Sequence, residues 1–302
     1  MERKNGWELK QSIIIRVKTF PQVKTNLIDK PIHIHVEPPT NRMAIGLKEI
    51  WQYRELLYFL VWRDIKVRYK QTILGASWAI LQPFLTMIVF SVFFGWLAKM
   101  PSDGVPYPLF TYTALLPWQL FAFGLNESGN SLVNNQRLIS KIYFPRLVVP
   151  ISSMLAGFID FAIAFVVLLG MLIFYGYPLK INLLVLPLFV LLAALTALAV
   201  GLWLSALNVV YRDIRYAIPF LTQFWLFLTP VAYPASLVPE SLQPIYALNP
   251  MVGVVEGFRW ALLGTANQPG LMVLVSALAM LVLLTGGLVY FRRMEAVFAD
   301  VI

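Results

Sequence analysis

The sequence contains no cysteine, only two histidines and few charged residues. Without cysteine the chain can form neither disulfides nor thiolate metal sites, and it has no cysteine nucleophile. Charged residues make up 13% of the 302 residues and hydrophobic residues 59%, whereas soluble domains have about 25% charged residues. Because so little polar surface cannot cover a soluble body of this size, the composition indicates an integral membrane protein.

Side chains for catalysis and for nucleotide binding are equally scarce. Both histidines, His33 and His35, precede the long apolar segments, and those segments enclose one acid, Asp160. An enzyme within a membrane needs clustered acids, bases or metal ligands, so we predict no catalytic residue, no metal site and no bound cofactor. No Gly-x-x-x-x-Gly-Lys-Ser/Thr sequence occurs, so any ATP that drives this protein is hydrolysed by another chain.

Residues 1–48 form a polar N-terminal region without an apolar run long enough for a signal peptide or a first span. Within it, Ile32 to Val36 alternates apolar residues with the two histidines, which favours a short strand. A His-x-His pair can bind a metal, but no third ligand type lies nearby, so we interpret the segment as a solvated strand. We expect the whole region to be a cytoplasmic extension.

Six long segments with almost no charge dominate the rest of the chain. Each reaches or exceeds the roughly 20 residues that a helix needs to cross a ~30 Å hydrocarbon core. They are Gln71–Ala98, Gly104–Asn126, Leu147–Leu179, Ile181–Tyr211, Tyr216–Pro239 and Ala261–Phe291. We therefore predict an all-α membrane protein in which residues 72–302 form a domain of six transmembrane helices.

Asp160 lies about 15 Å into the third segment, where an ionised acid is unfavourable and is by default a functional candidate. It could carry protons, or it could be a protonated or hydrogen-bonded group that joins two helices. A single acid without intramembrane histidine, lysine or arginine makes a poor proton relay. The sequence therefore disfavours a proton-driven carrier.

The chain carries 24 Lys and Arg against 15 Asp and Glu, a net charge of +9. With the N-terminus in the cytoplasm, eleven basic residues flank the helices on the inner side and three on the outer side. Because cytoplasmic loops collect Lys and Arg, this distribution places both termini inside and indicates topology, with no nucleic-acid partner. The inner residues are Arg63, Lys66, Arg68, Lys70, Arg137, Lys141, Arg146, Arg212, Arg215, Arg292 and Arg293, and the outer ones are Lys99, Lys180 and Arg259.

Residues 49–71 combine a short apolar run with interleaved charges, and the apolar run is too short to span a bilayer. This pattern is typical of a helix that lies at the cytoplasmic interface, with basic groups toward lipid phosphates or a partner. Asp64 and Arg68 share a helical face with Leu57 and Val61. That face could instead be buried in protein.

The segment between the fifth and sixth predicted helices contains the signals of a further helix. Asn249 supplies an N-cap, Pro250 an N1 proline and Gly264 a C-terminal stop. The residues between them are too few to cross a membrane, which favours a re-entrant or outer-leaflet half-helix. Glu256 and Arg259, three residues apart, can neutralise each other there.

Aromatic residues are abundant in the first and fifth predicted helices. Most such side chains pack against lipid or other helices, but flat rings can also line a channel in which a glycan slides. The candidates for a channel lining are Phe84, Phe90, Phe93, Phe220, Phe224 and Trp225.

Four runs of residues closely resemble the permease subunits of type-2 ABC exporters that move polysaccharides and polyol phosphates. These are RDIKVRYKQTILGASWAILQP at 63–83, FPRLVVP at 144–150, NVVYRDIRYAIPFLTQFWLFLTPVAYP at 208–234 and LNPMVGVVEGFRWALLG at 248–264. The resemblance covers about residues 45 to 300 and does not extend to the N-terminal region. It implies a homodimer in the bacterial inner membrane, docked on two copies of a cytoplasmic ATPase that binds ATP and Mg²⁺.

The resemblance also implies a cargo and roles for particular residues. The cargo would be an undecaprenyl-pyrophosphate-linked glycan such as O-antigen. The implied ATPase-coupling surface comprises the interfacial helix around residues 63–70, the loop of residues 135–146 and the short loop of residues 211–213. Its candidate residues are Arg137, Lys141, Arg146, Tyr211, Arg212 and Asp213, and the implied outer gate comprises Asn249, Pro250, Glu256 and Arg259.

The basic residues of the interfacial segment have two interpretations. As a hypothesis, Arg63, Lys66, Arg68 and Lys70 form a cytoplasmic rim that holds the lipid pyrophosphate transiently; alternatively, they only obey the positive-inside rule. Two rival functions also stay open. The first is a type-2 ABC permease for a drug or small lipid, and the second is a membrane-embedded enzyme of glycan assembly.

Overall fold

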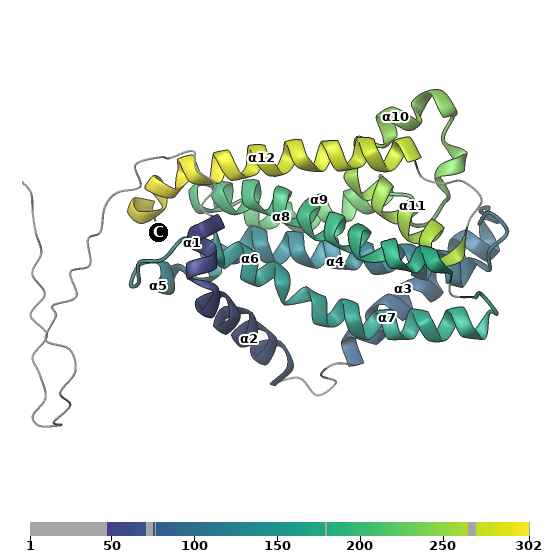
Figure 1. Ribbon diagram of the computed structural model, residues 1–302, viewed down its shortest axis with the longest axis horizontal. Coiled ribbons are helices and arrows are strands. Elements are labelled where there is room, and N and C mark those ends of the chain that lie inside the picture. Colours follow the sequence, from purple (N-terminus) through teal and green to yellow (C-terminus); the bar gives the residue numbers. More distant parts are fainter. Residues whose placement is uncertain (1–46, 71–74, 76, 179, 265–269, 302) are drawn as a thin grey trace, which may run out of the picture. The chain divides into compact units, whose positions relative to one another are not determined.

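The computed structural model describes residues 47–70, 75, 77–178, 180–264 and 270–301. The predicted strand at residues 32–36 and nearly all of the predicted N-terminal extension lie outside these residues. Helices make up most of the described chain and no strand occurs in it, in agreement with the predicted all-α class (Figure 1).

The helices fall into long members of a bundle and short connecting segments. The α-helices are α1 (Leu47–Gln52), α2 (Arg54–Lys70), α3 (Ser77–Phe90), α4 (Tyr107–Asn134), α5 (Gln136–Ile139), α6 (Val148–Leu155), α7 (Gly157–Phe174), α8 (Leu186–Val210), α9 (Ile214–Phe227), α10 (Gln243–Tyr246), α11 (Pro250–Leu263) and α12 (Gly270–Val301). The π-helical segment η1 (Ser91–Leu97) continues α3, and 3-10 segments form η2 (Ile181–Val185), η3 (Ala235–Leu237) and η4 (Glu240–Leu242).

Helix α4 is the centre of the bundle. It contacts α3, α6, α7, α8, α9 and α11, and in Figure 1 it runs between α8 and α12 on one side and α3 and α7 on the other. Most of its side chains from Leu109 to Leu125 are buried. Because the neighbouring helices cover it, α4 has little surface left for lipid.

Four segments of the described chain are long and apolar enough to cross a membrane: Ser77–Leu97, Val148–Phe174, Ile181–Val210 and Gly270–Glu295. Helix α4 has 28 residues and is therefore about 42 Å long, but it is more polar, in keeping with its burial. Helix α9 has only 14 residues. The six predicted spans thus correspond to these four segments together with α4 and α9, and their number stays a prediction.

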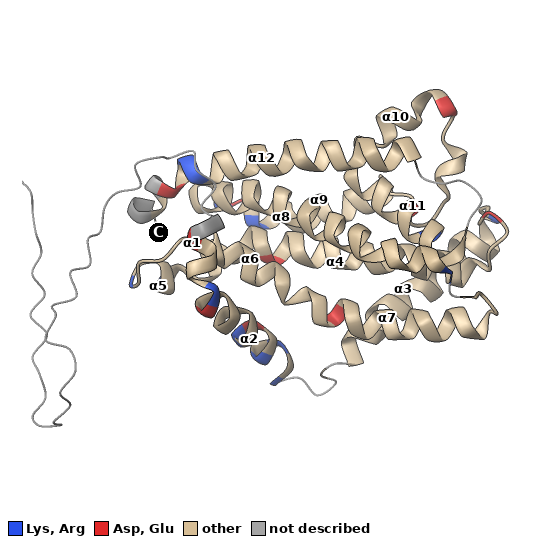
Figure 2. Cartoon of the chain, in the orientation of Figure 1, with Lys and Arg blue, Asp and Glu red and all other residues tan. Residues whose placement is uncertain are grey.

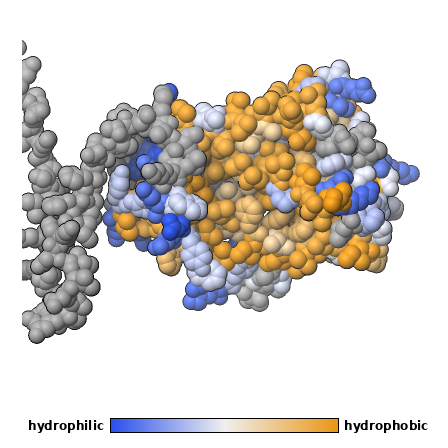
Figure 3. All heavy atoms as spheres, in the orientation of Figure 1, coloured by the Kyte–Doolittle hydropathy of each residue, from blue (hydrophilic) through white to orange (hydrophobic). Residues whose placement is uncertain are grey.

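Apolar and charged side chains are separated along the bundle. Figure 3 shows a broad apolar band across the long helices, bordered by polar residues at both ends. Figure 2 shows that charged residues gather at the two ends and on α2, with few along the middle of the bundle. We name the end that carries α1, α5 and the last turns of α12 the α5 end, and the opposite end the α10 end.

Small residues allow α4 and α8 to approach each other closely. A Cβ atom added to Gly201 of α8 would lie 2.8 Å from the Cβ of Ser128 on α4, and it would also collide with the Ser128 hydroxyl. Such a distance is incompatible with ordinary packing, so glycine is required where these two helices cross.

Candidate functional site

Helix α2 has one face buried against the bundle and another face exposed. Leu60 is buried in an apolar cluster at the α5 end, and Leu56 and Leu57 pack against the same cluster. On the exposed face, the Lys66 ammonium lies 5.2 Å from the centre of the Trp62 ring. Of the two interpretations of the interfacial segment, the structure supports the one in which a face of the helix is buried in protein. The aromatic and basic face of the helix stays exposed.

All four residues of the predicted basic rim are exposed, but two of them, Arg63 and Arg68, are also paired with carboxylates. The Arg63 guanidinium pairs with the Asp64 carboxylate at 2.8 Å and donates to the Asn135 side-chain oxygen at 2.9 Å. This second bond ties α2 to the end of α4. The ion pairs found in the described residues involve neither Lys66 nor Lys70, so these two ammonium groups are not neutralised by a carboxylate in that part of the chain.

The last turn of α2 is joined to α7 by an ion pair. The Arg68 guanidinium lies 2.7 Å from the Asp160 carboxylate and stacks 4.4 Å from the centre of the Phe123 ring on α4. The Tyr69 hydroxyl also donates to Asp160. Burial and this hydrogen bond raise the pKa of Tyr69 far above its ordinary range, so the phenol stays protonated and donates at neutral pH.

Asp160 is therefore the hydrogen-bonded acid that joins two helices, and Arg68 is a basic partner that the sequence did not reveal. The two residues lie on separate helices far apart in the chain. No local spacing links them, because α2 is the predicted interfacial segment and α7 belongs to a predicted span. Because Arg68 neutralises it, Asp160 is not an isolated charge among apolar helices.

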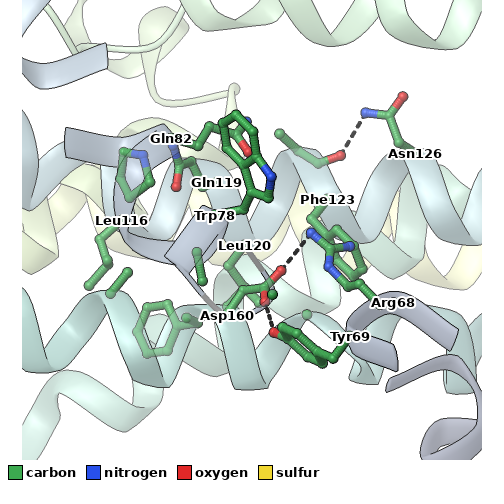
Figure 4. Close-up of a pocket in the computed structure, with 17 residues that line it drawn as sticks. Arg68, Tyr69, Trp78, Gln82, Leu116, Gln119, Leu120, Phe123, Asn126 and Asp160 are labelled. Atoms are coloured by element: carbon green, nitrogen blue, oxygen red, sulfur yellow. Dashed lines mark hydrogen bonds and ion pairs between the residues drawn. The ribbon is translucent and has the colours of Figure 1, made fainter. Parts of the chain in front are cut away.

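The same three residues border a cavity of about 420 Å³ between α2, α3, α4 and α7 (Figure 4). Its volume lies within the range of small-ligand pockets, roughly 300–1,000 Å³. In Figure 4, Arg68, Tyr69 and Asp160 lie together on one side, and Trp78, Gln82 and Gln119 on another. The lining residues are Arg68, Tyr69, Gly75, Trp78, Ala79, Gln82, Pro83, Leu116, Gln119, Leu120, Ala122, Phe123, Asn126, Gly157, Asp160, Phe161 and Ala164.

The predicted coupling residues between α4 and α6 have different surroundings. Arg137 and Lys141 are exposed. The backbone amide of Arg146 donates to the Glu295 carboxylate at 3.4 Å, its guanidinium donates to the Glu295 carbonyl, and the guanidinium lies 5.8 Å from the centre of the Phe298 ring. Arg146 therefore fastens the end of α12 to this loop.

The same loop also exposes two large apolar side chains, which lie within the predicted coupling loop but were not singled out from the sequence. Ile142 is 56% exposed and Tyr143 is 77% exposed. Exposed apolar side chains between basic ones at the end of a bundle are typical of a protein contact surface. In the sequence, only their positions between the basic residues Lys141 and Arg146 indicated that these two side chains belong to a contact surface.

The short loop between α8 and α9 presents Tyr211, Arg212 and Asp213, all of them exposed. The ion pairs found in the described part of the chain do not include one between Arg212 and Asp213. Both charged side chains are therefore accessible at the surface of the described chain. The structure brings this loop to the end of the bundle but does not test its predicted role.

The six candidate channel residues lie in two kinds of environment. Phe84, Phe93, Phe220 and Phe224 are exposed, and the last two stack with ring centres 6.5 Å apart. Phe90 and Trp225 are partly buried against the core. The candidates therefore include four rings on the surface of the chain and two that contribute to its packing.

Trp225 connects α9 to α11. Its indole N–H donates to the Asn249 side-chain oxygen at 2.8 Å, and its ring packs edge-on against Phe121 of α4. The same Asn249 oxygen accepts from the backbone amide of Met251 at 3.0 Å. One asparagine therefore caps α11 and fixes the end of α9.

Helix α11 forms as the sequence predicts. Asn249 is its N-cap, Pro250 is its first residue, and Gly264 ends it in the left-handed conformation with φ of 66°. Side chains along most of its length are buried. These observations confirm a short helix here, whereas its re-entrant position in a membrane stays a prediction.

Arg259 is the most deeply buried charged residue of α11, with 1% of its side chain exposed. It pairs with the Glu256 carboxylate at 2.9 Å, as the spacing predicted. It also donates to the Val231 carbonyl at 3.1 Å and lies 3.6 Å from the centre of the Phe110 ring. Arg259 therefore joins α11, α4 and the segment after α9.

In the part of the chain that the structure describes, no group of three or more His, Cys, Asp or Glu side chains is arranged to hold a metal ion. The described sites thus consist of one polar cavity, exposed loops at the α5 end and a buried ion pair near the α10 end. The predicted lack of a cofactor stays a prediction.

Comparison with known proteins identifies the family. A model of the ABC-2 type transporter family matches residues 55–263, which is more than half of the chain. The chain is 32% identical over 216 residues to the O-antigen export system permease protein RfbA of Myxococcus xanthus, a region that covers 70% of this chain and 82% of that protein.

Two further relatives match over more of their length. An O-antigen export system permease protein RfbA of Klebsiella pneumoniae is 26% identical over 250 residues, or 82% of this chain and 95% of that protein. The polysialic acid transport protein KpsM of Escherichia coli is 27% identical over 238 residues, or 77% and 91%. These matches and the four apolar segments show that this chain is an integral membrane protein that belongs to the ABC-2 type transporter family.

Proposed function

We propose that this chain is the transmembrane subunit of an ATP-driven exporter that moves a polysaccharide across the bacterial inner membrane. The observation that carries the proposal is the similarity of most of the chain to proteins named for O-antigen export and polysialic acid transport. The glycan leaves the cytoplasmic side linked to undecaprenyl pyrophosphate. A polysaccharide is too bulky to pass through the packed helices of one copy, so it requires a channel between two copies, and the working unit is a homodimer.

A separate ATPase, present in two copies, binds ATP and Mg²⁺ and drives the transport. It docks on the α5 end, where the exposed residues Arg137 and Lys141 lie on one loop and Tyr211, Arg212 and Asp213 on another. Exposed Ile142 and Tyr143 add apolar area to this surface. Arg146 supports it indirectly, by holding α12 against the loop.

The exposed rings Phe84, Phe93, Phe220 and Phe224 of α3, η1 and α9 face the second copy of the chain and line the channel. Flat rings hold the C–H faces of sugars without fixed hydrogen bonds, which suits a sliding polymer. The role of Phe90 and Trp225 is to support this lining from behind. Six helices span the membrane with both termini in the cytoplasm, and the re-entrant α11 gates the outer exit.

Exposed Lys66 and Lys70 of α2 receive the lipid pyrophosphate first. Ammonium groups on a flexible stem suit a transient contact, because they bind phosphate as point charges without a fixed geometry. Arg63 and Arg68 are already paired with carboxylates, so they contribute only after those pairs open.

The decisive experiment is reconstitution of export in a bacterial strain that lacks its own polysaccharide exporter. The chain is expressed with its ATPase and the glycan-assembly enzymes, and glycan on the cell surface is quantified with a specific antibody. Surface glycan that requires both the chain and ATP hydrolysis supports the proposal. Intracellular accumulation of the glycan with both proteins present, together with efflux of a drug or small lipid, would establish the rival permease function instead.

A second experiment tests the docking surface. Arg212→Glu and Asp213→Arg each alter an exposed charge, and we expect each to reduce co-purification of the ATPase severalfold at physiological salt, because charges at an interface steer association. The double variant should stay as impaired as either single one, since the two side chains do not pair with each other. Lys99→Glu at the α10 end is the matched control and should co-purify normally. Restored binding in the double variant would contradict this account.

A further inference from the structure

We propose that the cavity between α2, α3, α4 and α7 binds an uncharged saccharide ring within each copy of the chain. The inference rests on the proposed function, which supplies a sugar-bearing cargo. It adds a binding site inside the protomer, separate from the channel between copies and from the exposed lysines of α2. Three features of the cavity support the inference: its charge, its hydrogen-bonding groups and its exposed aromatic ring, Trp78.

The charge of the cavity favours a neutral ligand over a pyrophosphate. Its lining contains two charged residues, Arg68 and Asp160, and they neutralise each other at 2.7 Å. A phosphate that approached Arg68 would have to displace the carboxylate and leave it beside the anion, which is unfavourable because the two negative charges repel each other. A ring of hydroxyl groups can instead bind without breaking the ion pair.

Two carboxamides line the cavity without using their hydrogen-bonding capacity. The side chains of Gln82 on α3 and Gln119 on α4 make no hydrogen bond to other residues in the described ranges. By contrast, Asn126 donates to the Ala122 carbonyl at 2.7 Å and to the Thr222 hydroxyl at 3.2 Å. Each glutamine can donate and accept at once, as a sugar hydroxyl does, so the pair matches neighbouring hydroxyls on a ring.

Gln82 is exposed, whereas the position of Gln119 argues that something polar occupies the cavity. Gln119 is partly buried near the middle of α4, and α3 and α7 both belong to segments apolar enough to cross a membrane. A carboxamide without a hydrogen bond in apolar surroundings is destabilising by roughly 1–3 kcal/mol. Water or a hydroxyl-rich ligand removes this penalty, whereas an acyl chain does not.

Trp78 supplies an aromatic face beside the glutamines. In Figure 4 its indole lies next to Gln82 and Gln119, and the residue is 51% exposed. The Phe123 ring is covered by the Arg68 guanidinium, so Trp78 is better placed to accept the C–H face of a pyranose. An aromatic ring beside convergent polar groups is the usual composition of a specific small-molecule site.

The absence of natural cysteine makes this site testable by labelling. Ala79 lines the cavity, so an Ala79→Cys variant carries a single thiol there. The variant is assembled with its ATPase in lipid nanodiscs, which avoids detergents with sugar headgroups, and maleimide labelling is followed over time. Ser241→Cys, an exposed residue of η4 at the α10 end and therefore away from the docked ATPase, is the control thiol.

The probes are neutral oligosaccharides released from the host's surface polysaccharide by mild acid, and inorganic pyrophosphate. We expect the oligosaccharides to slow labelling of Ala79→Cys at least threefold without affecting Ser241→Cys, and pyrophosphate to have no effect. Adding Gln119→Leu should raise the half-protecting concentration about tenfold, the equivalent of about 1.4 kcal/mol. Size-exclusion chromatography verifies that this variant stays assembled.

Protection by pyrophosphate alone, or no protection by either probe, would overturn the inference. Equal protection of the Gln119→Leu variant would also overturn it, because the carboxamide would then make no contact with the sugar. The assay requires neither ATP hydrolysis nor transport. Export in cells without saccharide protection therefore refutes this site only, and protection without export refutes only the proposed function.

Discussion

The ion pair between Arg68 and Asp160 predicts a measurable coupling between α2 and α7. The perturbation is a double-mutant cycle with Arg68→Gln, which removes the positive charge and shortens the side chain, and Asp160→Asn, which removes the negative charge at nearly constant size. In the Asp160→Asn variant the side-chain carbonyl can still accept from Tyr69, so the cycle isolates the ion pair from that hydrogen bond. The two variants and their combination are compared with the natural chain.

The expected magnitude follows from the exposure of the two side chains. Arg68 is 40% exposed and Asp160 is 20% exposed, so the pair is intermediate between a surface pair and a buried one. Surface pairs contribute about 0.2–1 kcal/mol, whereas breaking a fully buried pair costs about 3–5 kcal/mol. We therefore expect a coupling energy of about 1–2 kcal/mol.

The assay is unfolding of the purified protein in mixed micelles by increasing denaturant, followed by tryptophan fluorescence. Asp160→Ala should destabilise the protein more than Asp160→Asn, because it also removes the acceptor for the Tyr69 hydroxyl. The exposed Arg212 offers a control: Arg212→Gln combined with Asp160→Asn should be additive within about 0.5 kcal/mol. A coupling energy below this value for Arg68 and Asp160 would refute the reasoning.

Two further changes test the packing of the bundle. Gly201→Ala should destabilise the protein by about 1–3 kcal/mol in denaturant unfolding, because the added methyl group overpacks against Ser128. Gly170→Ala is the control and should be neutral or slightly stabilising, because a Cβ atom there meets nothing within 4 Å. Equal effects of the two substitutions would contradict the close approach of α4 and α8. Arg259→Gln should lower the stability of the protein by about 3–5 kcal/mol, because it leaves the largely buried Glu256 carboxylate without its partner. The loss is detected as a lower yield of folded protein in size-exclusion chromatography. The double variant Arg259→Gln, Glu256→Gln should recover yield, and a double variant with no recovery would assign the defect to the other contacts of Arg259.

The elements that the sequence predicted well are those with local causes. Helix α11 begins at Asn249 and Pro250 and ends at Gly264, because capping and the left-handed conformation depend on residues within one turn. The pair of Glu256 and Arg259 follows from one turn of helix in the same way. The four long apolar segments follow from composition and length alone.

Other features of the sites could not be predicted because they depend on which helices become neighbours. The face of α2 that buries Leu60 is selected by the cluster at the α5 end, and the charge pattern of α2 was compatible with either lipid or protein there. Exposed Ile142 and Tyr143 have no local pattern that separates them from residues of an ordinary loop. The same limit applies to Phe90 and Trp225, whose partial burial depends on helix rotation.

The sequence by itself determined that this is a helical membrane protein with basic segments between its helices, because apolar length and charge are properties of the chain. Only the tertiary structure decided that Arg68 meets Asp160, and that Gln82, Gln119 and Trp78 surround one cavity with them. Helical periodicity specifies the face on which a side chain lies but not the helix that the face meets. That choice is made by the packing of α4 with its neighbours, which brings distant polar residues together.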